Sequence, residues 1–397
     1  MQVEHARPSP DDSPRRVMVV YGTRPEAIKV APVISMLGSD RRFLPLPVVT
    51  GQHREMLDQV NEAFGITPVR DLDLFCHGQT LNQLASRIFA ALGPVYCEVR
   101  PDAVLVQGDT TSVMAAAIAA YYEQIPVVHL EAGLRSHDFR LPYPEEANRK
   151  IVSQVTSLHL APTSSSRNNL LAEGVDPRRV AVTGNTVIDA LLRTSASESS
   201  TLTGPVGDVV DQGGRILLVT VHRRESWGPA VEGIGRALRT LAHTYPDDHI
   251  VFPVHRNPTV RTAVLPAVED LPNVVICEPL PYPQFTRLLA AAHVVLTDSG
   301  GVQEEAPSLH TPVLVMRENT ERPEAVEAGT VRLVGTEEDT IVREVRAIMD
   351  SRARYAAMAT GVNPYGDGRA AERCVAAIAD LLGVGSRVPD FHTTPDS

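Results

Sequence analysis

The sequence repeats one arrangement along most of its length. A short apolar run is followed by a turn of small or polar residues and then by a helix-favouring segment, as at residues 16–37, 103–122 and 216–244. Short apolar runs that alternate with helical segments are typical of parallel strands joined by crossover helices. The repeat therefore predicts an α/β fold of Rossmann-like units, each a parallel sheet covered by helices.

One of these turns carries groups suited to phosphate. A buried strand at residues 293–296 leads to Ser299, Gly300 and Gly301 at the start of a helix. Glycines let a backbone approach a ligand closely, and the first N–H groups of a helix are unpaired donors at the positive end of its dipole. Such a turn attracts phosphate, and Ser299 either caps the helix or donates to a phosphate oxygen. A plain turn is the alternative interpretation.

Charged residues surround this turn. Glu304 and Glu305 lie one helical turn further on, where one of them could accept hydrogen bonds from ribose hydroxyls. The next strand, residues 312–316, is followed by the charged residues Arg317, Glu318, Arg322 and Glu324. Ligands of open α/β sheets bind at the carboxyl ends of strands. Two successive strand ends with polar groups thus favour a site over a solvated loop.

A similar turn follows the first strand, at residues 16–21. Arg24 lies at the entrance of the helix that follows, and Lys29 lies within it. Two cations beside a helix N-terminus suit an anion, although they also fit an ordinary charged surface helix.

Three carboxylates follow predicted strands or open a helix. Asp109 and Glu131 both follow predicted parallel strands, and Glu145 lies in the first turn of a helix. A helix cap would explain Asp109 alone, an ion pair with Arg135 would explain Glu131 alone, and dipole complementation would explain Glu145. Finding Asp109 and Glu131 at equivalent strand ends favours a site.

Composition limits the classes of function. The 397 residues suggest two to three domains, and the formal charge of −11 argues against a broad nucleic-acid surface. The four cysteines are scattered, so neither zinc nor a disulfide framework is expected. No apolar run is long enough to span a membrane, and residues 1–15 lack a signal core. A cytoplasmic protein without a metal site or membrane partner is predicted.

Several blocks of sequence together carry a family resemblance. In order they are GTRPEAIK, TGQH, QGDTTS, EAGLRS, PEEANR, GNTVID, HRRES, VHRNP, DSGGVQEEA, RENTERPEA and NPYGDG. Over residues 17–382 the chain resembles the non-hydrolysing UDP-N-acetylglucosamine 2-epimerases of bacteria. The resemblance implies two Rossmann-like domains arranged as in GT-B glycosyltransferases, with the active site in the cleft between them. It also implies a homodimer that interconverts UDP-GlcNAc and UDP-ManNAc without a cofactor, through UDP and 2-acetamidoglucal.

The same resemblance implies roles for individual residues. The acid–base groups near the sugar would be Asp109, Glu131 and Glu145, with His222 at the departing phosphate. The UDP-binding groups would be Arg24, Lys29, Phe285, Ser299, Gly300, Gly301, Glu305 and Arg322. From the residues alone, Phe285 either fills the core or stacks on a base. Gln52, His53 and His255 correspond to residues that bind a second, activating UDP-GlcNAc in some relatives.

Residues 194–214 are rich in Ser, Thr, Gly and Asp and predict a linker. With the resemblance, the predicted organisation is a disordered extension (1–15), a first domain (16–195 with helix 369–383), a UDP-binding domain (214–366) and a flexible tail (384–397).

Two other functions compete with the epimerase. A hydrolysing 2-epimerase would release free ManNAc and UDP. A non-catalytic UDP-sugar sensor would close on its ligand without turnover, but it would not need the acid–base set. A glycosyltransferase is suggested by the fold alone, which is weak evidence for function.

Overall fold

The computed structural model describes residues 13–51, 54–76, 78–140, 142–195, 201–221, 229–320 and 322–393. Contacts between residues divide the chain into two units. The first contains the residues up to Thr183 together with Ala371–Asp390, and Gly184–Ala370 makes up most of the second. The extension predicted at residues 1–15 lies almost entirely outside the described residues.

The first unit is built on a seven-stranded parallel sheet with the order β3-β2-β1-β4-β5-β6-β7. Apolar side chains of β1 and β4 are buried on both faces, as expected for a sheet covered by helices on each side. The strands are β1 (Arg15–Tyr21), β2 (Phe43–Val49), β3 (Arg70–Asp71), β4 (Ala103–Gln107), β5 (Val127–Leu130), β6 (Leu158–Ala161) and β7 (Val180–Val182).

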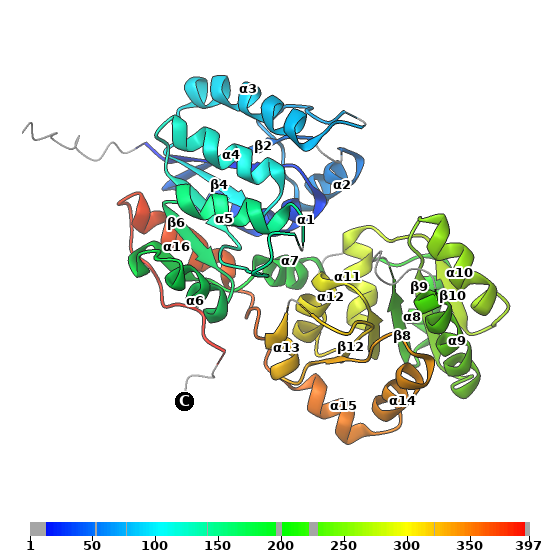
Figure 1. Cartoon of the computed structure of the whole chain (residues 1–397). Coiled ribbons are helices and arrows are strands. Elements are labelled where there is room, and N and C mark those ends of the chain that lie inside the picture. Colours follow the sequence, from blue (N-terminus) through cyan, green and yellow to red (C-terminus); the bar gives the residue numbers. More distant parts are fainter. Residues whose placement is uncertain are drawn as a thin grey trace, which may run out of the picture. The chain divides into compact units, whose positions relative to one another are not determined.

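Helices cover both faces of this sheet, and Figure 1 shows α3, α4 and α5 side by side on one of them. Thr80 and Thr110 accept backbone hydrogen bonds and so fix where α3 and α4 begin. The helices are α1 (Arg24–Ser39), α2 (Arg54–Phe64), α3 (Leu81–Val99), α4 (Thr111–Tyr122), α5 (Glu145–Val155), α6 (Ser164–Ala172), the 3₁₀ turn Pro177–Arg179 and most of α16 (Ala370–Leu381).

The second unit repeats the scheme with a six-stranded parallel sheet of order β10-β9-β8-β11-β12-β13. The α/β class with two parallel-sheet units is therefore confirmed. The strands are β8 (Ile216–Thr220), β9 (His249–Pro253), β10 (Val274–Cys277), β11 (Val294–Thr297), β12 (Val313–Val315) and β13 (Val331–Leu333).

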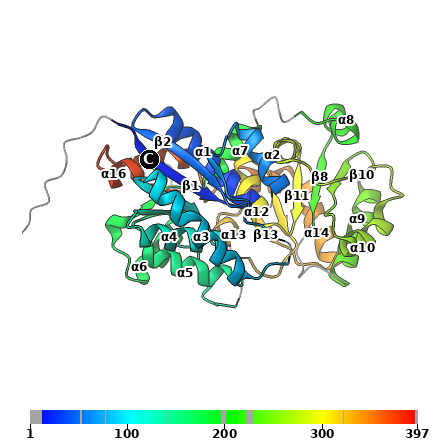
Figure 2. The same cartoon turned by 90° about the horizontal axis from the view of Figure 1, so that it is seen from above.

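Two layers of helices enclose this sheet, and Figure 2 shows β8 and β11 between α12 on one side and α9 and α14 on the other. The helices are α7 (Thr186–Ser195), α8 (Gly204–Gln212), α9 (Pro229–Thr244), α10 (Pro258–Val268), α11 (Tyr282–Ala291), α12 (Gly300–Glu305), α13 (Pro323–Glu327), α14 (Glu338–Met349) and α15 (Arg352–Ala359), with a 3₁₀ turn at Ala306–Leu309. No helix in the described ranges combines the length and apolar character of a membrane span.

The boundary between the units differs from the predicted one. Helix α7 belongs to the second unit, because the amide of Asn185 donates to the carbonyl of Tyr365 at 2.6 Å and Leu191 is buried in that unit's core. The predicted linker at 194–214 is also partly wrong, since it contains α8, whose Val206 and Val209 pack into the same core. Two valines three positions apart suffice to bury one face of a short helix.

The prediction of a flexible tail is wrong for its first half. Arg387 donates to the carbonyls of Val180 at 2.9 Å and Arg178 at 2.6 Å, and the amide of Val182 donates to Asp390 at 3.1 Å. These bonds attach the chain after α16 to the edge strand β7. An edge strand has free backbone groups, which residues beyond the last helix satisfy here.

Two histidines are buried side by side in the first sheet. His129 and His159 are paired neighbours on β5 and β6, 1% and 0% exposed. Desolvation lowers the pKa of His129 to about 4 and that of His159 to about 3, with neighbouring arginines adding to the effect. Both rings are therefore neutral in the folded protein near neutral pH.

This pair should make the first unit acid-sensitive. Between pH 6.5 and about 4 the unfolded chain binds protons that the folded unit excludes, so the free energy of unfolding falls as the pH falls. We expect His159→Leu to reduce the loss of stability between pH 7 and 5 by about 1–2 kcal/mol, measured by urea unfolding. The exposed His243, replaced by glutamine, serves as the control. Equal pH dependence in wild type and His159→Leu would contradict the assignment.

Candidate active site

The register of the first sheet brings two predicted acids to one edge. Gln107, the last residue of β4, pairs with Leu130, the last of β5, so Asp109 and Glu131 follow at the same level. The amide of Gly108 donates to the carbonyl of Leu130 at 3.0 Å, and a Cβ on Gly108 would lie 3.8 Å from Oε2 of Glu131. The Glu131 carboxylate thus lies beside the turn that carries Asp109.

Glu131 is held by two partners from other elements. Nζ of Lys29 on α1 contacts one carboxylate oxygen, and the amide of Gln107 donates to the other. The side chains of Lys29 and Glu131 are 15% and 8% exposed. The ion pair with Arg135 considered from the sequence is not formed. Arg135 instead binds Glu173 at 2.6 Å, which lowers the pKa of Glu173 to about 2.

Asp109 has a cationic partner of its own. Nη2 of Arg149 on α5 lies 2.8 Å from Oδ2 of Asp109. The cap of α4 is Thr110, whose hydroxyl accepts from the amide of Val113 at 3.3 Å. Capping therefore does not account for Asp109.

Glu145 is the first residue of α5, where its charge complements the helix dipole. Its Oε2 is buried and accepts no hydrogen bond within the described part of the chain. Among the three acids, Glu145 thus has an oxygen available for a further interaction.

The turn at the start of α1 differs from the anion site predicted there. The amides of Gly22 and Thr23 donate to the buried carboxylate of Glu26, at 2.6 and 3.1 Å. Burial raises the pKa of Glu26, and these amides and Thr110 partly offset the rise. The amides of Gly22 and Thr23, which precede the helix, are therefore bonded within the turn. The exposed Arg24 remains as the cation at the helix entrance.

In the second unit, Ser299 caps α12 by accepting from the amide of Val302 at 3.5 Å. The guanidinium of Arg322 lies over Gly300, because a Cβ there would be 2.6 Å from its Nη1. Nε of Arg322 donates to Glu304 at 2.7 Å, and Asn185 donates to the same carboxylate at 3.2 Å. The predicted turn thus carries a guanidinium directly above its glycine.

Glu305 follows Glu304 on α12 and lies close to the second glycine of the turn. Glu305 is 8% exposed, and its Oε1 would lie 3.7 Å from a Cβ on Gly301.

Phe285 is half-buried on α11 and packs against the core of the second unit. His255 is exposed after β9. Gln52, His53 and His222 lie outside the described residues.

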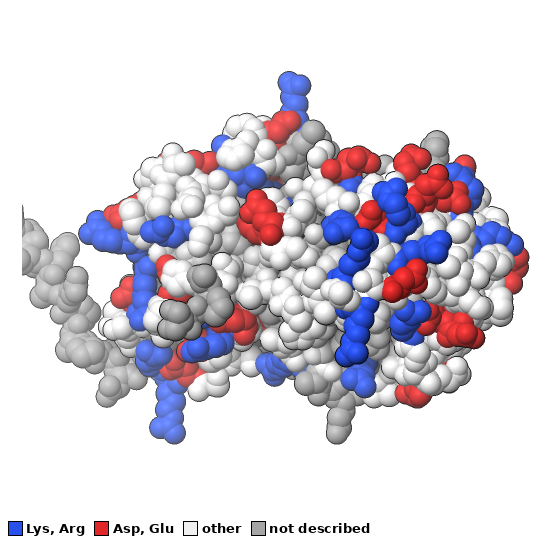
Figure 3. All heavy atoms as spheres, turned by 90° about the horizontal axis from the view of Figure 1, so that it is seen from below, with Lys and Arg blue, Asp and Glu red and all other residues white. Residues whose placement is uncertain are grey.

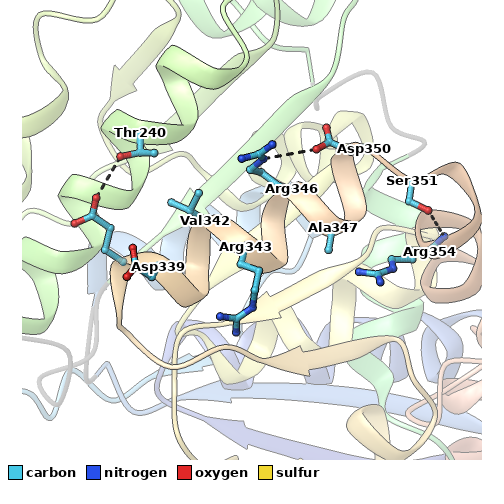
Figure 4. A pocket seen from close by; sticks show the side chains of 10 residues that line it. Thr240, Asp339, Val342, Arg343, Arg346, Ala347, Asp350, Ser351 and Arg354 are labelled. Carbon is cyan, nitrogen blue, oxygen red and sulfur yellow. Dashed lines mark hydrogen bonds and ion pairs between the residues drawn. The ribbon is translucent and has the colours of Figure 1, made fainter.

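The second unit also carries a surface pocket, and none of the residues that line it is a predicted site residue. It has a volume of about 610 Å³ and lies between α9, α14 and α15. Figure 4 shows Arg346 directed at Asp350, 3.7 Å apart, and Thr240 bonded to Glu338. Cationic side chains gather on this face in Figure 3, with acidic ones among them. The mixed charges and wide opening give no focused ligand site.

Two residues of the site were not singled out from the sequence. Gln107 is the last residue of a strand, and Arg149 lies one helical turn after Glu145. Their positions beside the acids follow only from strand register and helix packing. Over the described ranges, no three His, Cys, Asp or Glu side chains are grouped as for a metal ion.

The two parallel sheets, with helices on both faces and polar groups after their strands, define an α/β protein built of Rossmann-like units. The family model described as UDP-N-acetylglucosamine 2-epimerase matches residues 37–379. A probable UDP-N-acetylglucosamine 2-epimerase of Ralstonia nicotianae is 50% identical, covering 92% of this chain and 98% of that protein. The UDP-N-acetylglucosamine 2-epimerase of Escherichia coli K12 is 48% identical, covering 91% and 98%.

Solved structures agree with these sequence matches. The crystal structure of UDP-GlcNAc 2-epimerase from Neisseria meningitidis, bound to UDP-GlcNAc, has 43% identity and a TM-score of 0.83, and the match covers 92% of this chain and all of that one. The chain belongs to the UDP-N-acetylglucosamine 2-epimerase family.

Proposed function

We propose that this protein interconverts UDP-GlcNAc and UDP-ManNAc by inverting C2 of the sugar, without hydrolysis. The observation that carries the proposal is the set of three acids in the first unit. Asp109 and Glu131 lie at one sheet edge, each with its own cation, while Glu145 has a buried oxygen without a described partner. Relatives with the family name and a relative bound to UDP-GlcNAc support the choice of substrate.

The chemistry of the sugar explains why acids and a phosphate site are both needed. No carbonyl neighbours C2, so its hydrogen is not acidic in the intact substrate. When the bond between C1 and the UDP oxygen breaks, C1 becomes oxocarbenium-like and the C2 hydrogen becomes labile. A carboxylate takes that proton, and UDP and 2-acetamidoglucal result. Protonation of C2 from the other face and return of the UDP oxygen to C1 give the epimer, with all atoms conserved.

The described residues divide between these tasks. The acids of the first unit would move the proton at C2, because paired carboxylates in different surroundings serve as base and acid. Arg322, Ser299 and the glycines of the second unit would stabilise the charge that develops on the departing diphosphate. His222 is assigned to that phosphate from its motif. Arg24, Lys29, Glu305 and Phe285 keep the supporting roles implied by the family.

A solvent-exchange experiment tests the function. In deuterium oxide, UDP-GlcNAc incubated with the protein should gain deuterium at C2 while UDP-ManNAc appears, both followed by proton NMR. Accumulation of free ManNAc would instead identify the hydrolysing reaction. Binding of UDP-GlcNAc with neither exchange nor product, at high protein concentration, would favour the sensor and reject the epimerase.

The homodimer and the cytoplasmic location stay predictions, and analytical ultracentrifugation tests the homodimer.

A further inference from the structure

Arg149 makes a short contact with the Asp109 carboxylate. Its Nη2 lies 2.8 Å from Oδ2, and the two side chains are 11% and 26% exposed. A nearly buried guanidinium thus faces an acid that still reaches the surface of the unit. In such surroundings a close ion pair with a rigid, planar guanidinium restrains the position of the carboxylate.

The guanidinium is itself held on its other side. Nη1 of Arg149 lies 3.4 Å from Oε2 of Glu146, whose side chain is fully buried. Glu146 accepts from the amides of Ser136 at 2.9 Å and His137 at 3.2 Å. These two residues belong to the loop that follows Glu131. A bridge therefore runs from Asp109 through Arg149 and Glu146 to that loop.

The same helix also fixes the backbone of the turn. The side-chain amide of Asn148, which is 5% exposed, donates to the carbonyl of Asp109 at 2.8 Å. With Asn148 holding the main chain and Thr110 capping α4, the turn is secured without the Asp109 carboxylate. The remaining effect of Arg149 is on where that carboxylate points.

We propose that Arg149 is a positioning residue of the epimerase, which holds the Asp109 carboxylate in its reactive orientation from the buried side. The proposal rests on the proposed function. Helix α5 then sets two of the three acids, Glu145 as its first residue and Asp109 through Arg149 one turn later. It also contacts the loop after Glu131 through Glu146, so a shift of α5 would move Glu145, Asp109 and that loop together.

A double-mutant cycle on the full-length protein tests this role. Arg149→Met should lower kcat about 10- to 100-fold and leave the KM for UDP-GlcNAc within about threefold. Arg149→Lys, which keeps the charge but loses the planar fork, should recover part of the loss. Because the two residues act as one unit, Arg149→Met should cause almost no further loss in an Asp109→Asn background.

Lys150→Met is the matched control, because Lys150 is adjacent on α5 and pairs with Glu173 at 3.2 Å. It should keep wild-type kcat, and melting curves of all variants report whether they fold. The role of Arg149 is overturned if Arg149→Met is as active as wild type, if only KM changes, or if its effect multiplies with that of Asp109→Asn. Absence of C2 exchange in wild type would instead overturn the proposed function itself.

Discussion

Glu131→Gln should lower kcat for the conversion of UDP-GlcNAc to UDP-ManNAc by about 10²–10⁴-fold. The amide has the size of the carboxylate but cannot take up or return the proton at C2. The backbone there is held by the sheet, because Glu131 follows β5 directly. Initial rates of UDP-ManNAc formation, followed by NMR, measure the effect. Deuterium exchange at C2 should fall by the same factor, since both depend on the same proton transfer.

The same substitution removes the negative charge that faces Lys29, so stability must be measured separately. A mostly buried cation that loses its carboxylate partner is destabilising, and the melting temperature should fall. Glu98→Gln is the matched control, because Glu98 pairs with Arg70 at 2.6 Å on an exposed part of the same unit. Its kcat should equal that of wild type. A folded Glu131→Gln protein with kcat within about threefold of wild type would remove Glu131 from the proton transfer.

The sequence was sufficient to predict that Asp109 and Glu131 both follow the carboxyl ends of parallel strands. Each follows an apolar run of a βα repeat, and parallel strands in consecutive repeats end at the same edge. That these two strands are also neighbours depends on the strand order, since β3 and β4 are consecutive in the chain but not adjacent in the sheet. The same reasoning placed Ser299 and Gly300 at the end of β11.

Which cation pairs with which carboxylate could not be predicted from the order of strands and helices. Lys29 and Glu131 are 102 residues apart, and their contact depends on how α1 packs against β1 and β4. Arg135 is closer to Glu131 in sequence, yet its side chain reaches Glu173 at the end of α6. Sequence distance favours the nearer partner, whereas the direction of each side chain decides the actual one.

The boundary between the units shows a similar limit. Residues 204–212 are poor in apolar side chains, which made a linker the simpler interpretation. Helix α8 nevertheless forms, because two valines contribute to a core supplied mainly by distant residues. The composition of a segment shows which apolar side chains it can contribute to a core, but it does not show which residues from other parts of the chain surround that segment.

Gly133→Ala should destabilise the first unit by about 3–5 kcal/mol. Gly133 lies two residues after Glu131 with a φ of 93°, where an L side chain is strained. A Cβ there would lie 2.2 Å from the carbonyl oxygen of Ser166 and 2.8 Å from its carbon. The obstacle is backbone at the start of α6, which cannot rotate away as a side chain could.

Alanine substitutions at two other glycines of the same unit distinguish the cost of a positive φ from the cost of a collision of the added Cβ. Gly174 has a φ of 86°, and a Cβ added to it would meet nothing within 4 Å, so Gly174→Ala should cost only about 1–2 kcal/mol. Gly93 lies within α3 with equally open surroundings and no positive φ, so Gly93→Ala should stabilise by about 0.5–1 kcal/mol. Urea unfolding of the three variants measures the series.

The difference between Gly133→Ala and Gly174→Ala isolates the collision with Ser166. Since the carbonyl of Gly133 also accepts from Asn169 at 3.0 Å, relief of that collision would move the loop away from α6 and displace Glu131. Any folded Gly133→Ala protein should therefore lose activity as well as stability, whereas Gly174→Ala should lose stability alone. Equal destabilisation by the two substitutions would mean that the loop after Glu131 can move without cost, which would contradict a fixed position for that acid.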